Sequence, residues 1–158
     1  MTSIPAASQR VIEAGRSLGV AVEVTIYPEG TKTAVAAAAA VGCEVSAIVK
    51  SLVFTVDGRP VVALVPGDLR LDTAKLAAAF GGGASARAGL EEVRAATGFA
   101  AGGTPPFGHV TELPVVADPA LRRHDVVWAA AGTPTTVFPI TPEDLGRAAS
   151  ARWVDVTV

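Results

Sequence analysis

A single lysine in an otherwise apolar stretch is the first residue whose type and position could support chemistry. Lys50 lies within Ile48 to Phe54, whose β-branched and large apolar residues favour a β-strand. A cation held at the edge of a pocket can bind a phosphate or a developing negative charge. The same pattern also fits a lysine on the solvent face of a strand, with its aliphatic stem covering apolar surface. The pattern around Lys50 leaves both interpretations open.

A loop rich in glycine and proline, from Gly98 to His109, is the second such feature. Gly102 and Gly103 allow the main chain to approach a ligand closely, and Pro105 and Pro106 stiffen the loop. Such a loop can donate main-chain N–H groups to an oxyanion without any catalytic side chain. An ordinary rigid connection between two elements would have a similar composition, so this alternative also stays open.

Small residues from Trp128 to Pro134 form the third feature. Where a strand ends, small side chains such as Gly132 and the short polar Thr133 can line a tight pocket. They can equally pack under a neighbouring helix, as small residues often do.

Motifs for metal, phosphate and nucleophilic chemistry are absent from the sequence. There is no phosphate-binding glycine loop, zinc-binding His-Glu-x-x-His helix or Gly-x-Ser-x-Gly nucleophile elbow. The only two histidines, His109 and His124, exclude a three-histidine metal site, and the lone Cys43 excludes an internal disulfide. Cys43 is interpreted as a small buried residue rather than a nucleophile. We therefore expect neither a metal nor a cofactor.

Length and composition predict one folded domain over residues 1–158. Half of the residues are hydrophobic and 18% are charged, which is unlike a disordered chain. No apolar run approaches the ~18 residues of a membrane span, and residues 1–9 lack the basic start and apolar core of a signal peptide. We expect a cytoplasmic protein with no membrane partner.

The net charge of −2 argues against a protein that coats nucleic acid. Strong non-specific binding requires Lys and Arg to neutralise several phosphates. DNA is therefore not an expected partner, although a local basic patch could still dock one shaped RNA.

The expected elements mix hairpins with helical connections. Helices are expected over residues 8–18, from Thr31 or Thr33 to Gly42, from Asp72 to Phe80, over 90–97 and from Thr141 onward. Strands are expected over residues 22–27, 45–56, 60–65, 84–87, 113–117, 126–130, 135–140 and 153–158, with a hairpin turn at Asp57-Gly58. Because strands and helices do not alternate regularly, the predicted fold class is α+β. We expect a mixed, largely antiparallel sheet of about seven strands with surrounding helices.

Four segments, in this order and spacing, together resemble a known family. They are the Thr-Ala-x-x-Ala-Ala-x-x-x-Gly helix at 33–42, the Val-Lys-Ser-Leu strand within 48–54, Val-Pro-Gly-Asp-x-Arg-Leu-Asp-x-x-Lys at 65–75, and the loop at 102–108. This set resembles the YbaK-type aminoacyl-tRNA deacylases, relatives of the editing insertion domain of bacterial prolyl-tRNA synthetase. The likeness runs from Tyr27 to the C-terminus.

The resemblance implies hydrolysis of the ester that joins a wrong amino acid to the terminal ribose of a tRNA. It assigns catalytic roles to Lys50, Gly102 and Gly103. Lys50 would hold the phosphate or ribose end of the acceptor, and loop N–H groups between Gly102 and Pro106 would face the substrate carbonyl. It implies no general base, metal or cofactor, because an activated ester, a positioned water and the 2′-hydroxyl of the tRNA can suffice.

The resemblance also implies a substrate-binding set. Its members are Tyr27, Thr33, Phe54, Pro106, Phe107, His109, Gly132 and Thr133. His109 could contact the tRNA end or orient water, but it could equally be bonded to loop backbone. Alanine-clearing members carry His and Asn near the last strands, where this chain has Ala129 to Gly132, so their way of choosing a substrate does not transfer directly.

The sequence thus predicts a free-standing trans-editing hydrolase for a small amino acid on tRNA, with tRNA-Pro as the leading tRNA. Alanine is the first candidate, followed by serine, threonine, cysteine and 2-aminobutyrate. Expected partners are the acceptor end of the mischarged tRNA and either prolyl-tRNA synthetase or an elongation factor. The alternatives are a non-catalytic module that binds a tRNA end or a synthetase, and a hydrolase of small aminoacyl esters.

Overall fold

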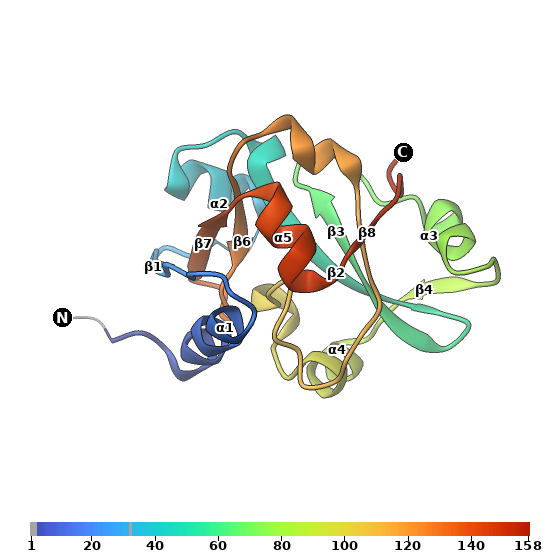
Figure 1. The fold of residues 1–158 in the computed structure, drawn as a ribbon, viewed down its shortest axis with the longest axis horizontal. Helices are drawn as coiled ribbons and strands as arrows, with labels where there is room; N and C mark the ends of the chain where they lie inside the picture. Colours follow the sequence, from blue (N-terminus) through green and yellow to red (C-terminus); the bar gives the residue numbers. More distant parts are fainter. Residues whose placement is uncertain (1–2, 32) are drawn as a thin grey trace.

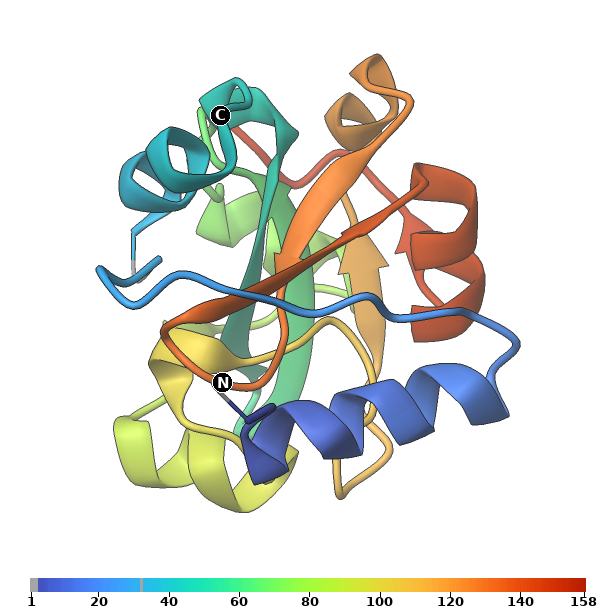
Figure 2. The same cartoon turned by 90° about the vertical axis from the view of Figure 1, so that its left-hand side faces the viewer.

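One mixed sheet lies between two layers of helices in the computed structural model, which describes residues 3–31 and 33–158 (Figures 1 and 2). The described strands are β1 (Thr25–Ile26), β2 (Ile48–Val56), β3 (Arg59–Pro66), β4 (Ser85–Arg87), β5 (Val115–Ala117), β6 (Val127–Ala130), β7 (Thr136–Ile140) and β8 (Arg152–Trp153). Their order in the sheet is β1-β7-β6-β2-β3-β5-β8, and β4 pairs with β2 outside this path.

The described helices are five α-helices and three short 3₁₀ helices. The α-helices are α1 (Ala6–Ser17), α2 (Ala34–Val41), α3 (Thr73–Ala79), α4 (Leu90–Thr97) and α5 (Pro142–Ala149). The 3₁₀ helices are η1 (Val45–Ala47), η2 (Ala101–Gly103) and η3 (Pro119–Arg123). None of the described helices has the length and apolar character needed to span a membrane.

Strand pairing confirms the predicted α+β class with a mixed sheet. Strand β2 runs antiparallel to β3 and β4 but parallel to β6, and β3 runs parallel to β5. The remaining described pairings are antiparallel for β1–β7 and β6–β7 and parallel for β5–β8. More of the pairings are parallel than the hairpin signals in the sequence indicate. The parallel pairings are those of β6 with β2, β5 with β3 and β8 with β5, strands that are not joined by hairpins.

Alternation along the central strand places helices on both faces of the sheet. Val49 and Val53 of β2 belong to the main core together with Val11 of α1, Val93 of α4 and Leu145 of α5. Leu52, Phe54 and Val56 of β2 pack instead on the side of α3, and Ile48 packs on the side of α2. The strand that carries Lys50 is therefore covered on both sides.

Local capping explains where the elements next to β2 begin and end. The Thr33 hydroxyl accepts a hydrogen bond from the Ala36 N–H at 3.0 Å, which caps the start of α2. Helix α2 ends at Gly42, whose φ of 82° is left-handed as predicted. Asp57 and Gly58 both have positive φ, 51° and 79°, which suits the tight β2–β3 turn and confirms the predicted hairpin.

Several predicted strands are shorter than expected. Residues 45–47 form η1 rather than the start of β2. Of the predicted strand 22–27 only Thr25–Ile26 pairs as a strand, and of 153–158 only Trp153 does, as the last residue of β8. Both short strands, β1 and β8, lie at the edges of the sheet. An edge strand has a neighbour on one side only, and short edge strands limit the main chain that is left unpaired. A short 3₁₀ helix that the sequence patterns do not predict, η3, is capped at its start by Asp118.

Candidate active site

A cavity of about 430 Å³ opens on the face of the sheet that α2 covers. Residues from elements far apart in the sequence line it: Thr31, Thr33, Ala34 and Ala37; Ile48, Val49, Lys50, Ser51 and Leu52; Arg87 and Leu90; Ala101, Gly102 and Thr104; and Trp128, Ala130 and Val137. Of the residues predicted to form the site, the cavity brings together Thr33, Lys50 and Gly102. These three residues come from separate elements: Thr33 caps α2, Lys50 lies on β2 and Gly102 lies in η2.

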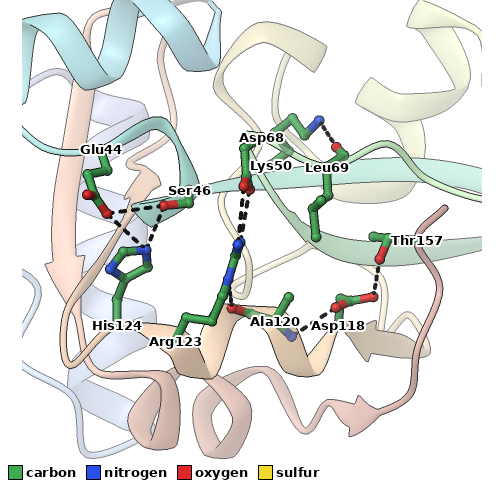
Figure 3. Close-up of polar contacts among 10 residues, drawn as sticks. All are labelled: Glu44, Ser46, Lys50, Asp68, Leu69, Asp118, Ala120, Arg123, His124 and Thr157. Carbon is green, nitrogen blue, oxygen red and sulfur yellow. Dashed lines mark hydrogen bonds and ion pairs between the residues drawn. The ribbon is translucent and has the colours of Figure 1, made fainter.

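Lys50 is a partly buried cation rather than a lysine on an exposed face. Its ammonium donates a hydrogen bond to the Leu69 carbonyl oxygen at 2.7 Å (Figure 3). Burial lowers the pKa of Lys50 from its usual range, and the negative charge of Asp68 opposes that shift. An ammonium has three N–H donors, so this bond fixes the group while leaving donors for a substrate oxygen.

Gly103 holds the η2 loop in place by close packing. A side-chain carbon on Gly103 would lie 2.5 Å from the Thr133 Cα, which is too close for any other residue. The Gly103 N–H donates to the Ala100 carbonyl at 3.0 Å and is therefore occupied within the loop. For the Gly102 N–H, by contrast, no acceptor is found among residues 3–31 and 33–158. Of the two predicted glycines, Gly102 is thus the one placed to donate toward the cavity.

The second half of the loop packs into the protein and does not line the cavity. Phe107 is buried in the main core, with its ring edge-on to Phe138 at 5.7 Å between centroids, and Pro106 is also buried. The His109 ring donates through Nε2 to the Pro105 carbonyl at 2.8 Å. Burial lowers the pKa of His109, and the bond to Pro105 opposes the shift. His109 is therefore bonded to loop backbone, and it does not line the cavity.

Gly132 and Thr133 do not line the cavity but pack against elements next to it. A side-chain carbon on Gly132 would lie 2.9 Å from the Ala7 main chain at the start of α1. The Thr133 hydroxyl lies 2.7 Å from the Thr136 hydroxyl, and the Thr133 main chain packs against Gly103. Thr133 thus packs against the η2 loop, and Gly132 packs against the start of α1.

Tyr27 and Phe54 lie beside the cavity rather than in its lining. The Tyr27 N–H donates to the Thr135 carbonyl at 2.7 Å, which ties the turn before α2 to the β6–β7 loop. Phe54 lines a recess of about 70 Å³ that shares Arg87 and Leu90 with the main cavity. A binding role for either residue stays a prediction.

Four residues that line the cavity are not predicted by the sequence patterns: Ser51, Arg87, Leu90 and Trp128. Arg87 is the last residue of the three-residue strand β4, and Leu90 is 76% exposed at the start of α4. An exposed leucine leaves no periodic signal in the sequence, so only the pairing of β4 with β2 reveals its position. Trp128 is in register with Ile48, which lies 80 positions earlier in the chain, and local sequence does not indicate this pairing.

A second hollow of about 530 Å³ lies elsewhere, lined in part by Arg122, His124, Glu143 and Trp153. The Arg122 guanidinium stacks over the Trp153 ring at 4.0 Å from its centroid. None of the predicted site residues lines this hollow, and its cation is already paired with an aromatic face. The cavity beside Lys50 is therefore the better candidate. Within the described part of the chain, no cluster of three or more His, Cys, Asp or Glu could hold a metal ion.

Comparison with known proteins agrees with this geometry. The family model for the aminoacyl-tRNA editing domain matches residues 28–148. The chain is 32% identical over 136 residues to the uncharacterized protein YwhH of Bacillus subtilis (strain 168), covering 85% of this chain and 86% of that protein. It is 29% identical over 133 residues to EbsC of Enterococcus faecalis (strain ATCC 700802 / V583), a candidate Cys-tRNA(Pro)/Cys-tRNA(Cys) deacylase, covering 83% and 80%.

A solved structure points the same way. The crystal structure of a candidate trans-editing enzyme for prolyl-tRNA synthetase superposes with a TM-score of 0.93 at 42% identity, covering 99% of each chain. Fold, cavity and relatives define an enzyme that removes amino acids from tRNA. The chain belongs to the aminoacyl-tRNA editing domain family, as the resemblance to YbaK-type proteins implied, and is an aminoacyl-tRNA deacylase.

Proposed function

We propose that residues 1–158 act as one trans-editing domain that hydrolyses the ester of a small mischarged amino acid on tRNA, with tRNA-Pro as the leading tRNA. The observation that carries the proposal is the composition of the cavity. Lys50 and Arg87 are the only charged side chains that line it within the described residues, and Gly102 presents its main chain there. Such a site can bind an anionic tRNA end and polarise an ester carbonyl.

Each group has a distinct task in this mechanism. The Lys50 ammonium holds a phosphate or ribose oxygen of the acceptor end, while its bond to Leu69 keeps it at the cavity edge. The Gly102 N–H donates to the ester carbonyl as negative charge develops on its oxygen. Water attacks the carbonyl carbon with the 2′-hydroxyl of the tRNA nearby, the tRNA oxygen leaves, and the free amino acid and the intact tRNA are the products.

The lining favours a small amino acid. Ala34, Ala37 and Ala130 present methyl groups, and Trp128 closes one side with a large ring. Alanine is the first candidate, and serine, threonine, cysteine and 2-aminobutyrate follow, because one methylene changes binding by only about 1–3 kcal/mol. The name of EbsC adds weight to cysteine, and the trans-editing relative supports a link to prolyl-tRNA synthetase.

The charge of the chain suggests how tRNA is selected. At a net charge of −2, a protein that holds only the acceptor end binds weakly and with a shallow salt dependence. We infer that prolyl-tRNA synthetase or an elongation factor supplies tRNA identity, in the cytoplasm where both act.

The test is a panel of tRNA-Pro species charged with alanine, cysteine, serine, threonine, 2-aminobutyrate or proline. Purified protein should release free alanine fastest and leave prolyl-tRNA intact. Lys50→Ala should lower kcat/KM about 10- to 100-fold, chiefly through KM, since a charge-assisted contact to substrate is lost. Lys75→Ala is the control: it removes a half-buried lysine outside the cavity that pairs with Asp155 and donates to the Thr157 carbonyl.

Three outcomes would count against the proposal. Protection of mischarged tRNA without release of amino acid would favour the binding module. Equal cleavage of simple aminoacyl esters and aminoacyl-tRNA would favour the small-ester hydrolase. Unchanged turnover in Lys50→Ala would remove the role given to Lys50.

A further inference from the structure

Strand β2 has a short open edge inside the cavity. Along one edge it pairs with β3 from Val49 to Val56. Along the other edge it pairs with β6 at Ile48 and Val49 and with β4 from Phe54 to Val56. Between these two ladders, no strand in the described chain covers residues 50–52, and all three line the cavity.

The register turns the main chain of Ser51 toward this open edge. Ser51 lies opposite Leu64 of β3, and the Leu64 carbonyl accepts from the Asp118 N–H on the far side, at 3.0 Å. In an antiparallel pair such residues direct their N–H and C=O groups away from each other. The Val53 carbonyl, two residues further along, accepts from the Ala88 N–H on the same outer side, as this alternation requires.

Ala130 completes the opening from the neighbouring strand. The N–H of Ala131 donates to Thr136 of β7, so the main-chain groups of Ala130 point the opposite way, toward β2. The β2–β6 ladder ends at the pairing of Val49 with Ala129, one residue before the Ala130 carbonyl could meet Ser51. The two strands therefore part with carbonyl oxygens facing the space between them.

The Ser51 hydroxyl is the one buried side-chain oxygen or nitrogen in the described residues that lacks a hydrogen-bond partner. The residue as a whole is only partly buried, so its accessible surface comes from other atoms than Oγ. An unpartnered hydroxyl can rotate about the Cα–Cβ bond without giving up any hydrogen bond. By alternation along β2, the Ser51 side chain lies on the same face of the sheet as Val49 and Val53, opposite Lys50. Ser51 Oγ can therefore meet a donor held at the open edge only from that face.

We propose that this open edge binds the uncharged α-amino group of the amino acid on the tRNA, whose two N–H groups donate to oxygens among the main-chain carbonyls of Ser51 and Ala130 and Ser51 Oγ. The inference rests on the proposed function and deepens it. An aminoacyl group carries an N–H donor and a C=O acceptor at the spacing found in one residue of a strand. It can therefore occupy the place of a missing strand residue beside Ser51, between the β6 and β4 ladders. The ester carbonyl is then left for Gly102, on the η2 side.

The charges of the residues that line the cavity agree with recognition of the amino group by uncharged oxygen atoms. No carboxylate lines the cavity among the described residues, and Lys50 and Arg87 are both cations. A nearby positive charge disfavours the protonated form of an amine, so the site holds the uncharged amino group as a hydrogen-bond donor. Specificity for an α-amino acid then comes from donors and acceptors rather than from an ion pair.

The test compares tRNA charged with alanine and tRNA charged with lactic acid, in which a hydroxyl replaces the α-amino group. Each enzymatic rate is divided by the spontaneous hydrolysis rate of the same ester, which removes their difference in intrinsic reactivity. We expect an acceleration at least 10-fold lower for the lactyl ester. Ser51→Ala should lower kcat/KM for the alanyl ester about 10-fold and narrow the gap between the two esters.

A stability measurement separates this role from a structural one. Because Ser51 Oγ makes no hydrogen bond, Ser51→Ala should leave the thermal midpoint unchanged or raise it. The control is Ser46→Ala, which removes a hydroxyl 2.7 Å from His124 Nε2 and should lower the midpoint while sparing activity. Equal acceleration of both esters, or an unchanged gap in Ser51→Ala, would overturn this inference alone. Failure to cleave the alanyl ester would overturn the proposed function as well.

Discussion

Two polar regions lie close to β2 and differ in how completely their groups are partnered. The first is the η3 segment, residues 118–124, drawn in Figure 3. The Asp118 carboxylate accepts hydrogen bonds from the Ala120 N–H, the Val156 N–H and the Thr157 hydroxyl at 2.9–3.0 Å. Arg123 forms a two-point ion pair with Asp68, at 2.9 and 3.2 Å. In this segment, the polar side chains have found their partners within the protein.

The second region is the cavity, where polar groups are left free. Among the described residues, Ser51 Oγ and the Gly102 N–H have no partner, and the Lys50 ammonium makes one hydrogen bond. Since an unpartnered buried polar group costs free energy, groups of this kind persist where a ligand completes them. The contrast indicates that η3 serves stability and the cavity serves binding, and substitutions should separate the two.

The largest expected effect is on activity, from Gly103→Ala. The added methyl group would lie 2.5 Å from the Thr133 main chain, so the η2 loop must move and carry the Gly102 N–H with it. Losing one oxyanion donor typically lowers kcat about 100- to 1000-fold. Gly89→Ala is the matched control, because a side-chain carbon there meets no atom within 4 Å. Single-turnover hydrolysis with a circular dichroism check measures both; normal activity in Gly103→Ala would remove the loop from the mechanism.

The next effect is on stability, from Asp118→Ala. Removing this 3% exposed carboxylate leaves three donors unpartnered, two of them main-chain N–H groups. We expect a loss of about 3 kcal/mol in the free energy of unfolding, measured by urea denaturation. The folded fraction should keep its kcat. A loss of turnover larger than the loss of folded protein would contradict the separation of the two regions.

Much of the fold followed from local sequence rules, because capping and turn residues act over a few positions. Thr33, Gly42, Asp72 and Thr141 each stand where the structure starts or ends a helix. The order of strands in the sheet did not follow from the sequence. It depends on pairings such as Ile48 with Trp128, which join distant segments and leave no local pattern.

The site was predictable in part for the same reason. Lys50 and Gly102 stand out by residue type and line the cavity, whereas Ser51 is recognisable only once two separate ladders are seen to end on either side of it. The family resemblance places Phe107 in the substrate-binding set, but the residue does not line the cavity. The loop turns Phe107 into the core, where a large aromatic side chain gains more from burial.

A smaller expected effect is on the pH dependence of stability, from His109. This residue lies in the same loop as Gly102, but its ring is hydrogen-bonded within the protein, like the polar side chains of η3. Burial lowers its folded-state pKa below the value of about 6.5 expected for the unfolded chain. Its contribution to stability is therefore complete above about pH 6.5 and is lost as the pH falls through the folded-state pKa. His109→Gln should make the urea midpoint less sensitive to pH between 7.5 and 5.5. Equal pH sensitivity in both proteins would show that His109 is not the titrating group.

The smallest expected effect tests whether the two regions communicate through charge. Asp68 raises the pKa of Lys50, and the hydrogen bonds and charge of Arg123 lower the pKa of Asp68. Asp68→Asn should move the alkaline limb of kcat/KM to lower pH, because the Lys50 ammonium loses its proton more easily. Arg123→Gln should move it slightly to higher pH, since Asp68 then acts on Lys50 without a competing cation.

These two shifts are small, because the ion pair is exposed and screened by solvent. Their opposite signs are what make the experiment decisive. A general loss of stability would move both variants in the same direction, whereas a change in the charge near Lys50 must move them apart. Opposite shifts that shrink as salt is raised would place the protonated Lys50 ammonium in the reaction. A common shift would mean that η3 affects activity only by supporting the fold.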